Sequence, residues 1–536
     1  MPKKISNQPK RINIGGRWGS EYTSIDIKKY LTKIRATTTE TYVKWIDIEP
    51  ESGEITFKRF DRDLKKFNEY GVKWQPFLIC GPWYATPYWY REGTDSHVFR
   101  CLEHDKDSGI QSIWNEKFKP VTRRFLKLFH QHYKDHTGID SLLLGISGDY
   151  GEAIYPCIGN FDGQYHTHRG FWCNDRYAIA DFQKQMKAQF KTITKLNARW
   201  GTSYADFTQV KPFLKKDSPS RRAMVDMVYW YRNAMLKHAE FWLKEVRKLW
   251  KTKDVYLCMG GDSSAEEGQY YTAAAKLCAK YNVGIRDTNS RDHFRFLNTY
   301  QCSTAVATNF YKTYCGFESS HGSTRKFIIA RMFAFIVSNA REFHEYSFEN
   351  KPEVIKNFCK FRKWMDIRVN RKADVAVLSS EPYINWHHEH ATAWDLKEFP
   401  WGLPKAPHDL FDQLRYHFDF DLVNDALIRD NILDNYKALI IPGFTIIEDD
   451  ILELIRQRAK AGQKVIIHGP DTLETVDEKP IQIDHAEASA NMAKLLASLK
   501  ASGVRVKARK DGIYEVVDPQ QGILCYDERK DRIYWK

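Results

Sequence analysis

The sequence predicts an α/β protein that begins with a (β/α)8 barrel, and three observations support this fold class. Short apolar runs alternate with helical patterns from about residue 11 to 348. Eight of these runs have the length and composition of buried strands. The alternation restarts near residue 371, which predicts a smaller, doubly wound α/β domain of the flavodoxin or amidotransferase type, with a short β-rich segment after it.

The eight expected barrel strands lie at 11–16, 41–46, 72–80, 141–144, 255–259, 283–287, 313–317 and 342–348. Helical spacing of apolar residues connects them, as at 60–70, where Phe60, Leu64 and Phe67 share one face and Gly71 ends the helix. Further helices are expected at 121–133, 222–250 and 351–369. A long segment at about 157–219 follows the fourth strand, and insertions at this place shape substrate pockets in barrels.

The predicted domains are the barrel at 1–370, the second α/β domain at 371–500 and the β segment at 501–536, which would be incomplete as an independent unit. In the second domain, 373–380, 438–442 and 464–468 have the pattern of parallel strands. No cysteine lies between Cys359 and Cys525, which excludes a thiol-based amidotransferase site there.

Composition narrows the function classes. The formal net charge is +14 over 536 residues, but the lysines and arginines are scattered along the chain. We therefore expect a solvated basic surface and no nucleic-acid partner. An anionic sugar as the substrate is the alternative that this charge leaves open. Ten cysteines without a C-x-x-C pair argue against a structural zinc site and a disulfide framework. No apolar run is long enough to span a membrane, so we expect no membrane partner. The chain as given is expected to be cytoplasmic, with a secreted or periplasmic protein whose signal peptide was trimmed as the alternative.

Candidate catalytic acids follow two of the expected strands. The stretch 142–156 runs from leucines into three glycines, with Asp149 and Glu152 among them. Glu318 comes directly after the seventh strand. Because the carboxyl ends of barrel strands carry the catalytic groups, two such acids predict hydrolysis of a glycosidic bond. A solvated Gly-rich turn is the alternative for the first stretch, and a helix N-terminal acid is the alternative for Glu318.

Aromatic rings and other strand-end acids are expected to bind the substrate around this pair. Rings form platforms for sugars, and a core does not hold unpaired acids. The candidates are Trp83 and Tyr84 after the third strand, Asp262, Asp287 and Glu345 at the fifth, sixth and eighth, and Arg17 and Trp18 after the first. Core packing is the alternative for the rings.

Several motifs resemble two families of glycoside hydrolases. Residues 45–53, Trp-Ile-Asp-Ile-Glu-Pro-Glu-Ser-Gly, and 196–204, Leu-Asn-Ala-Arg-Trp-Gly-Thr-Ser-Tyr, are similar to family 42, the β-galactosidases. Residues 151–156, Gly-Glu-Ala-Ile-Tyr-Pro, and 170–177, Gly-Phe-Trp-Cys-Asn-Asp-Arg-Tyr, resemble the β-amylases of family 14. The motifs are short but occur in the right order. The second domain is similar to the trimerisation domain of family 42, which implies a homotrimer or another homo-oligomer.

The resemblance also implies residue roles. The β-amylase-like Gly-Glu pair places the general acid on Glu152, whereas the family 42 pattern Asn-Glu-Tyr-Gly, here Gly-Asp-Tyr-Gly at 148–151, places it on Asp149. We favour Glu152 because both families use a glutamate; Asp149 would then tune its pKa or bind a sugar hydroxyl. Glu318 matches the family 42 nucleophile. The cysteine positions of that family's zinc cluster are not reproduced, so neither metal nor cofactor is implied.

The prediction is therefore a retaining exo-glycosidase that acts on a β-linked glycoside or oligosaccharide in the manner of a β-galactosidase. An inverting, β-amylase-like glucan hydrolase is one alternative. The other is a non-catalytic glycan-binding barrel, which the missing asparagine before the acid supports.

Overall fold

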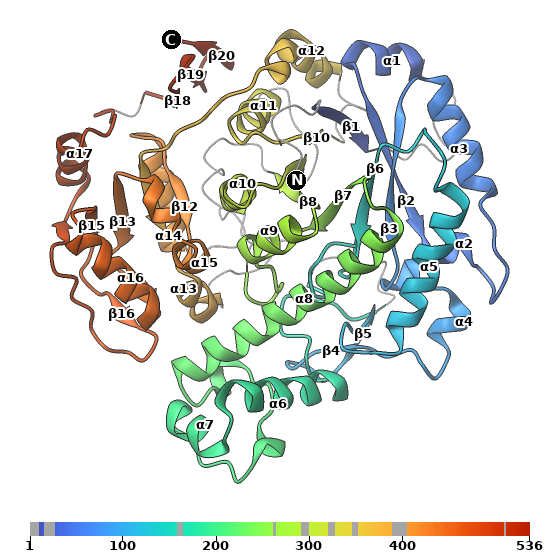
Figure 1. The fold of residues 1–536 in the computed structure, drawn as a ribbon, viewed down its shortest axis with the longest axis horizontal. Coiled ribbons are helices and arrows are strands. Elements are labelled where there is room, and N and C mark those ends of the chain that lie inside the picture. Colours follow the sequence, from blue (N-terminus) through green and yellow to red (C-terminus); the bar gives the residue numbers. More distant parts are fainter. Residues whose placement is uncertain are drawn as a thin grey trace.

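The computed structural model describes residues 10–15, 27–157, 165–260, 264–290, 300–319, 327–345, 352–388, 405–508 and 511–536. Eight parallel strands close into a barrel, each paired with its neighbour in chain order (Figure 1). They are β1 (Arg11–Gly15), β2 (Thr38–Lys44), β3 (Lys73–Ile79), β6 (Ser141–Gly145), β7 (Asp254–Met259), β8 (Gly284–Ser290), β9 (Cys315–Ser319) and β10 (Glu342–His344). The predicted (β/α)8 barrel is confirmed.

Two strand boundaries differ from the prediction in ways that matter for the site. Strand β2 begins at Thr38, three residues before the expected start, because the β-branched Thr38 and Thr39 extend its pairing with β1. It ends at Lys44, where the short helix α2 (Trp45–Ile48) begins. Strand β9 runs to Ser319, so Glu318 belongs to the strand itself.

Helices surround the barrel and bury their apolar faces against the strands. They are α1 (Ile27–Ile34), α3 (Lys58–Glu69), α5 (Phe118–Tyr133), α8 (Arg221–Leu249), α9 (Tyr271–Lys280), α10 (Tyr300–Phe310), α11 (Phe327–Val337) and α12 (Pro352–Phe361). Helix α8 starts where the Ser220 side chain accepts a hydrogen bond from the Ala223 amide, and its 29 residues extend well past the barrel (Figure 1).

Two excursions leave the barrel near the candidate site. After β3 come the turn η2 (Trp83–Ala85), the helix α4 (Tyr88–Arg91) and the antiparallel hairpin of β4 (Val98–Arg100) and β5 (Asp107–Gln111). The long segment after β6 contains α6 (Arg176–Phe190) and α7 (Ile193–Trp200), which lie at the far end of α8 (Figure 1). Asp175 caps α6 by accepting from the Tyr177 and Ala178 amides.

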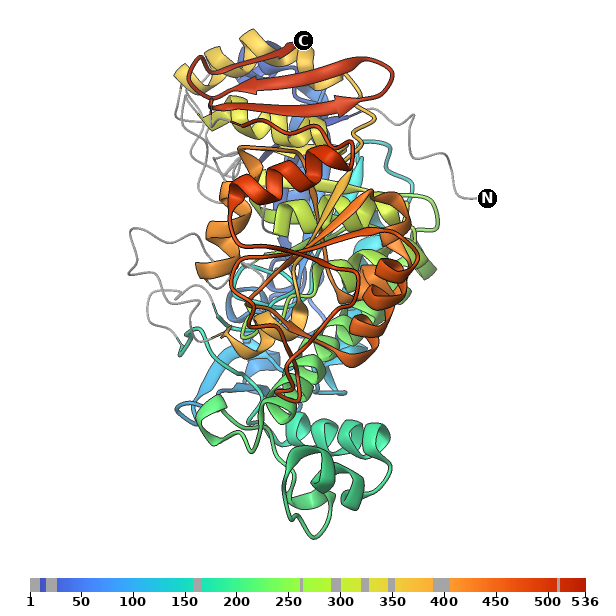
Figure 2. The same ribbon diagram turned by 90° about the vertical axis from the view of Figure 1, so that its left-hand side faces the viewer.

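A second parallel sheet lies beside the barrel (Figure 2). Its order is β12 (Asp421–Val423), β11 (Val375–Leu378), β13 (Ala438–Pro442), β15 (Lys464–His468) and β17 (Glu487–Ser489). The first of these strands in the chain, β11, lies second in the sheet, which is the flavodoxin-like order 2-1-3-4-5 and confirms the predicted doubly wound fold. The sheet carries helices α14 (Lys405–Arg415), α16 (Asp449–Lys460) and α17 (Met492–Ala501).

The second sheet and the C-terminal strands share cores with the barrel. Cys302 and Val306 of α10 belong to the apolar core of the second sheet. The chain ends in an antiparallel sheet of β18 (Ile513–Asp518), β19 (Gly522–Asp527) and β20 (Arg532–Trp535). This sheet covers α11, where the Phe333 and Tyr526 rings stack 5.6 Å apart. The double cover explains why every residue of α11 except Arg331 is apolar.

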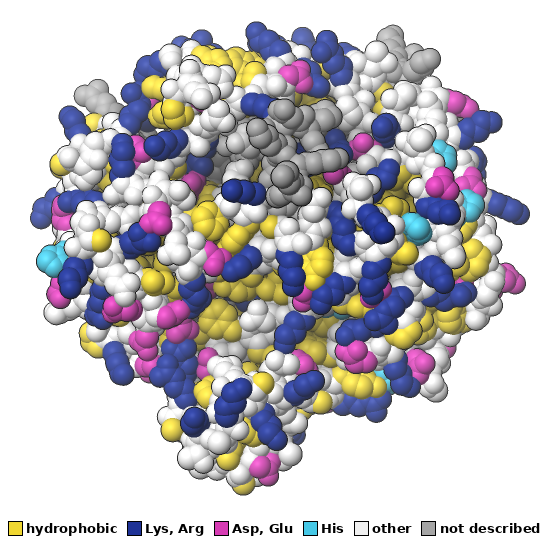
Figure 3. Space-filling model, viewed as in Figure 1, with side chains coloured by type: hydrophobic (Ala, Val, Ile, Leu, Met, Phe, Trp, Pro, Cys, Tyr) yellow, Lys and Arg dark blue, Asp and Glu magenta, His cyan; other side chains and the backbone are white. Residues whose placement is uncertain are grey.

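On one face of the molecule, the basic residues are dispersed rather than gathered in a stripe. Figure 3 shows lysines and arginines spread over the viewed face with acidic side chains between them. Among the described residues, no helix has the length and apolar character needed to cross a membrane.

Candidate active site

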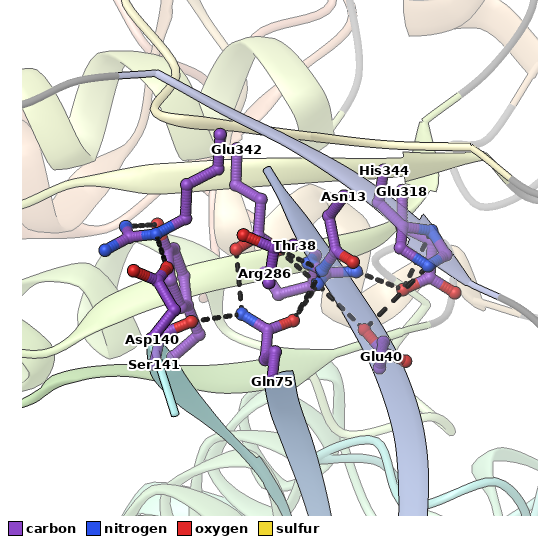
Figure 4. A network of polar contacts seen from close by, with 12 residues as sticks. Asn13, Thr38, Glu40, Gln75, Asp140, Ser141, Arg286, Glu318, Glu342 and His344 are labelled. Carbon is purple, nitrogen blue, oxygen red and sulfur yellow. Dashed lines mark hydrogen bonds and ion pairs between the residues drawn. The ribbon is translucent and has the colours of Figure 1, made fainter. Parts of the chain in front are cut away.

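A buried arginine lies at the centre of a polar network inside the barrel. Arg286 of β8 is fully buried; its Nη1 donates to Glu318 Oε2 at 2.8 Å, and its Nη2 donates to Glu40 Oε2 at 2.9 Å. It also donates to Gln75 Oε1 at 2.5 Å and forms an ion pair with Glu342. Five different strands supply these residues, and all point into the barrel (Figure 4).

Burial and the Arg286 guanidinium act in opposite directions on the carboxyl groups of this network. Burial raises the pKa of Glu40 to about 8, with the nearby Glu318 and Glu342 also raising it and Arg286 opposing them. Burial and the neighbouring acids thus favour the protonated form of Glu40, and the Arg286 guanidinium favours the ionised form. Glu318 is held by the guanidinium, and an opposite charge at hydrogen-bond distance favours the ionised carboxylate.

His344 of β10 faces the same two acids. Its Nδ1 is 3.9 Å from Glu318 Oε2 and its Nε2 is 3.8 Å from Glu40 Oε2. Burial, together with the charges of Arg286 and Arg331, holds the pKa of His344 well below its usual range, so the ring is neutral. Arg286 thus supplies the positive charge next to Glu318.

Removing that cation will destabilise the barrel. We expect Arg286→Met to lower the free energy of unfolding by about 3–5 kcal/mol, because it leaves buried carboxylates without their cation. Urea unfolding followed by circular dichroism measures this. The control is Arg59→Met, since the Arg59–Asp47 pair at 3.2 Å is largely exposed and is worth about 1 kcal/mol or less. Equal effects of the two substitutions would contradict the assignment.

The turn after β6 presents the other acids. Ser147 and Gly151 form an antiparallel bridge that closes the turn, and Gly148 and Gly151 have φ of +64° and +99°, which glycine adopts without strain. Gly260, at the end of β7, makes room for the acid: a Cβ there would be 2.5 Å from Cγ of Glu152.

Glu152 has the environment of a general acid. Burial raises its pKa to about 7, and the negative charge of Glu318 adds to the rise. Hydrogen bonds to the Glu152 carboxylate, among them one from the Thr288 side chain, lower the pKa and so oppose this rise. Among the described residues, none forms a hydrogen bond with Oε2 of Glu152. A carboxyl group that stays protonated near pH 7 and keeps an oxygen open can donate a proton to a ligand.

Asp149 has a different partner. It is fully buried and accepts a hydrogen bond from the Tyr165 hydroxyl at 3.0 Å. Tyr84 lies near both acids, since burial and the charges of Glu152 and Asp149 raise its pKa well above the usual value. Trp83 is half-buried, its ring 6.2 Å from that of Tyr165 and 4.3 Å from the Arg91 guanidinium. The structure thus brings Trp83, Tyr84, Asp149 and Glu152 to one side of the site.

Two predicted substrate-binding acids point elsewhere. Asp287 follows Arg286 in β8, so it faces the helices, where the Thr304 hydroxyl of α10 is 3.5 Å from its Oδ2. Glu345 forms an ion pair with Arg331 of α11 and accepts from the Ser319 hydroxyl at 3.2 Å. The structure does not bring these two to the pair Glu152 and Glu318. Arg17, Trp18 and Asp262 lie outside the described residues.

Sequence reasoning missed the inward-facing polar residues. Tyr42 of β2 is one, since burial and the charges of Glu152, Glu318 and Glu40 raise its pKa well above the usual value. Part of this arrangement could have been recognised in the sequence. Polar residues two positions apart in a buried strand share one face, and in a barrel strand that face is the interior, as for Glu40 and Tyr42 and for Glu342 and His344.

Comparison with known proteins agrees with this architecture. The model of glycoside hydrolase family 42, described as beta-galactosidase, matches residues 16–259. Over these residues, which are less than half of the chain, the sequence is similar to the family 42 glycoside hydrolases. The beta-galactosidase of the psychrophilic Marinomonas ef1 has a similar fold, with a TM-score of 0.71, 10% identity and coverage of 97% of this chain and 95% of that one.

Curated sequences give two more relatives of this family 42-like chain. It is 23% identical over 226 residues to beta-galactosidase BbgII of Bifidobacterium bifidum, which covers 39% of this chain and 30% of that protein. It is 26% identical over 157 residues to a thermophilic beta-amylase of Thermoanaerobacterium thermosulfurigenes, covering 26% of this chain and 28% of that protein. The matches span less than a third of either relative. The double resemblance predicted from the motifs is confirmed.

Proposed function

We propose that this chain is a retaining exo-glycosidase that hydrolyses a β-linked glycoside in the manner of a β-galactosidase. The observation that carries the proposal is the contrast between two acids. Glu318 is held by the Arg286 guanidinium at 2.8 Å, whereas Glu152 is buried with its pKa raised to about 7. One carboxylate is thus ready to attack and one carboxyl group is ready to donate a proton.

The proposed reaction has two steps. First, an oxygen of Glu318 attacks the anomeric carbon, the bond to the leaving oxygen breaks, and that oxygen takes the proton of Glu152. Water then attacks the anomeric carbon of the glycosyl-enzyme, gives a proton to Glu152 and displaces Glu318. Because the charge of Glu318 raises the pKa of Glu152, forming the ester lowers it again, so Glu152 acts as an acid first and as a base afterwards.

The other residues support this pair. The neutral ring of His344 lies 3.9 Å from Glu318, and Glu40, whose pKa burial raises, binds the same guanidinium as Glu318. Trp83 and Tyr84 are proposed as the sugar platform, and Asp149 as a group that binds a hydroxyl or tunes Glu152. For Asp287 and Glu345 we propose a role in positioning strands β8 and β10. From the second-domain resemblance, we also propose a homotrimer.

The pH dependence follows from the raised pKa. Below about pH 7 Glu152 carries the proton that the first step requires. Above it the group ionises, and we expect kcat/KM to fall about tenfold per pH unit. A profile from pH 4 to 9 measures this. In Glu152→Gln the alkaline fall should disappear from the residual activity; a fall at the same pH in that variant would assign it to another group.

A panel of aryl glycosides tests the proposed function directly. The expected result is hydrolysis of an aryl β-galactoside, or of another aryl β-glycoside, by the full chain, with none by Glu318→Gln. The resemblance to a beta-amylase favours an inverting glucan hydrolase as the second candidate, which would turn over maltooligosaccharides instead. Glycan binding without turnover on either set would contradict the proposal and identify a binding barrel.

A further inference from the structure

The carboxyl ends of two strands of the second sheet hold a buried polar cluster that faces the barrel. Glu381 begins the helix α13 (Glu381–Trp386) after β11, and Asn424 and Asp425 follow β12. Asn424 Nδ2 donates to Glu381 Oε1 at 2.6 Å, and Asp425 Oδ2 accepts from the Glu381 amide at 2.9 Å. All three residues are more than nine-tenths buried. In doubly wound folds, ligands bind outside these strand ends.

In this chain an arginine of the barrel occupies that place. Arg232 lies on α8, which runs beside α13 (Figure 1). It is 2% exposed; it forms an ion pair with Glu381, and its Nη1 donates to Asn385 Oδ1 at 2.8 Å. Its Nε donates to the backbone oxygen of Gln269 at 2.6 Å. Arg232 therefore joins the second sheet to the segment between β7 and α9.

Gln269 continues this connection to Glu152. Its buried Nε2 donates to the backbone oxygen of Gly260 at 2.6 Å and to Glu267 Oε2 at 2.8 Å. Both partners are acceptors, so only the NH2 group of the amide fits there. A Cβ on Gly260 would be 2.5 Å from Cγ and 3.0 Å from Cδ of Glu152. Gln269 therefore holds the backbone against which the side chain of Glu152 packs.

Docking of the two domains does not account for this arrangement. Arg222, a second buried arginine of α8, already joins the domains, because it pairs with two carboxylate groups of the second domain at 2.8 and 3.1 Å. Among the described residues, Arg222 forms no hydrogen bond with Gln269 or Gly260. Docking alone would not require the Gln269 amide to face Gly260. Of the two arginines, Arg232 is the one connected to the backbone beside the acid.

We propose that Gln269 and Arg232 are positioning residues, which fix the backbone of Gly260 so that Glu152 keeps the place that proton transfer requires. The second domain thereby helps to hold the acid/base of the barrel. This inference rests on the proposed role of Glu152 in hydrolysis. Its physical basis is the sensitivity of proton transfer to geometry, because a displacement of about 1 Å at a reacting group can cost about 10²-fold in rate.

Gln269→Met tests the proposal without removing a charge. It deletes both hydrogen bonds of the amide at nearly equal volume, so the fold should persist, with an unchanged circular dichroism spectrum. We expect kcat/KM to fall about tenfold on a phenyl glycoside, whose leaving oxygen needs the proton, and to change by less than about twofold on a dinitrophenyl glycoside. Equal losses on the two substrates, or no loss on either, would overturn the proposal.

The same substitution made in Glu152→Gln separates positioning of the acid from other effects. With no acid to position, Gln269→Met should add no further loss on the phenyl glycoside. A further loss of about tenfold would show that Gln269 acts through another group, and would overturn the proposal. If Glu152→Gln itself shows no dependence on the leaving group, the role of Glu152 fails, and its positioning fails with it.

Arg232→Met and Arg222→Met form a matched pair, since each removes a buried arginine of α8 that pairs with the second domain. Both should lower the melting temperature. Arg232→Met alone should steepen the dependence on the leaving group and speed the hydrogen exchange of the peptide that contains Gly260. Gln269→Met should speed the same exchange, which keeps the test valid if Arg232→Met does not fold.

The exchange measurement needs no substrate, so it distinguishes two kinds of failure. Faster exchange without any effect of Glu152→Gln on catalysis would overturn the catalytic role of Glu152. Unchanged exchange in Gln269→Met, with Glu152→Gln behaving as a lost acid, would overturn the positioning alone. Equal effects of Arg232→Met and Arg222→Met on both readouts would assign the effect to domain docking and would contradict the proposal.

Discussion

Glu318→Gln will lower kcat by about 10⁴-fold or more on any aryl glycoside that the wild type hydrolyses. The amide cannot form the glycosyl ester, but its oxygen can still accept the hydrogen bond that Arg286 donates to Glu318. The fold should therefore persist, with an unchanged circular dichroism spectrum and a similar melting temperature. Initial rates with the wild type and the variant at equal concentration measure the loss.

Rescue by a small nucleophile separates loss of the nucleophile from loss of structure. In Glu318→Ala the side chain leaves space for azide next to the anomeric carbon, and azide should restore turnover of an activated β-glycoside. The sugar azide should have the α configuration because a single displacement inverts the anomeric centre. Full activity in Glu318→Gln, or azide rescue at another acid, would show that Glu318 is not the nucleophile.

Glu152→Gln will lower kcat/KM by about 10²–10⁴-fold on substrates with poor leaving groups, because no proton reaches the leaving oxygen. On a dinitrophenyl glycoside, whose leaving group needs no proton, the first step should be nearly unaffected. The comparison of leaving groups therefore reports on acid catalysis rather than on folding. Steady-state kinetics with a series of aryl glycosides gives the measurement.

Asp149→Asn is the matched control for Glu152. Asp149 accepts a hydrogen bond from Tyr165 and lies three residues away in the same turn. Its substitution should change KM or shift the alkaline pH limit without steepening the dependence on the leaving group. If Asp149→Asn shows the steeper dependence and Glu152→Gln does not, the two roles are reversed.

Much of the fold could be read from the sequence because its signal is local. Apolar runs of strand length and helical spacing mark the barrel and the second sheet, and the flavodoxin-like strand order agrees with that prediction. Gly148 and Gly151 marked the turn that presents Asp149 and Glu152, since their positive φ angles suit glycine. Glu318 could be found because it directly follows the expected strand 313–317, and the carboxyl ends of barrel strands carry the catalytic groups.

The rest depends on contacts that barrel closure creates. Arg286 of β8 meets Glu40, Gln75 and Glu342 only because barrel closure brings three other strands to face it. The alternation of side chains along a strand also decides which of two consecutive residues faces the barrel interior: Arg286 points inward and Asp287 outward. The sequence-based prediction chose Asp287 because it took this residue as the end of a strand that in fact continues to Ser290. Sequence spacing alone does not fix either feature.

The stereochemistry of the first sugar released tests the central claim most directly. Proton NMR of the best aryl β-glycoside, recorded during the first minutes of hydrolysis, distinguishes the anomers before mutarotation mixes them. A double displacement by Glu318 and Glu152 predicts that the β anomer appears first. First appearance of the α anomer would contradict a covalent intermediate on Glu318 and would favour the inverting, β-amylase-like mechanism.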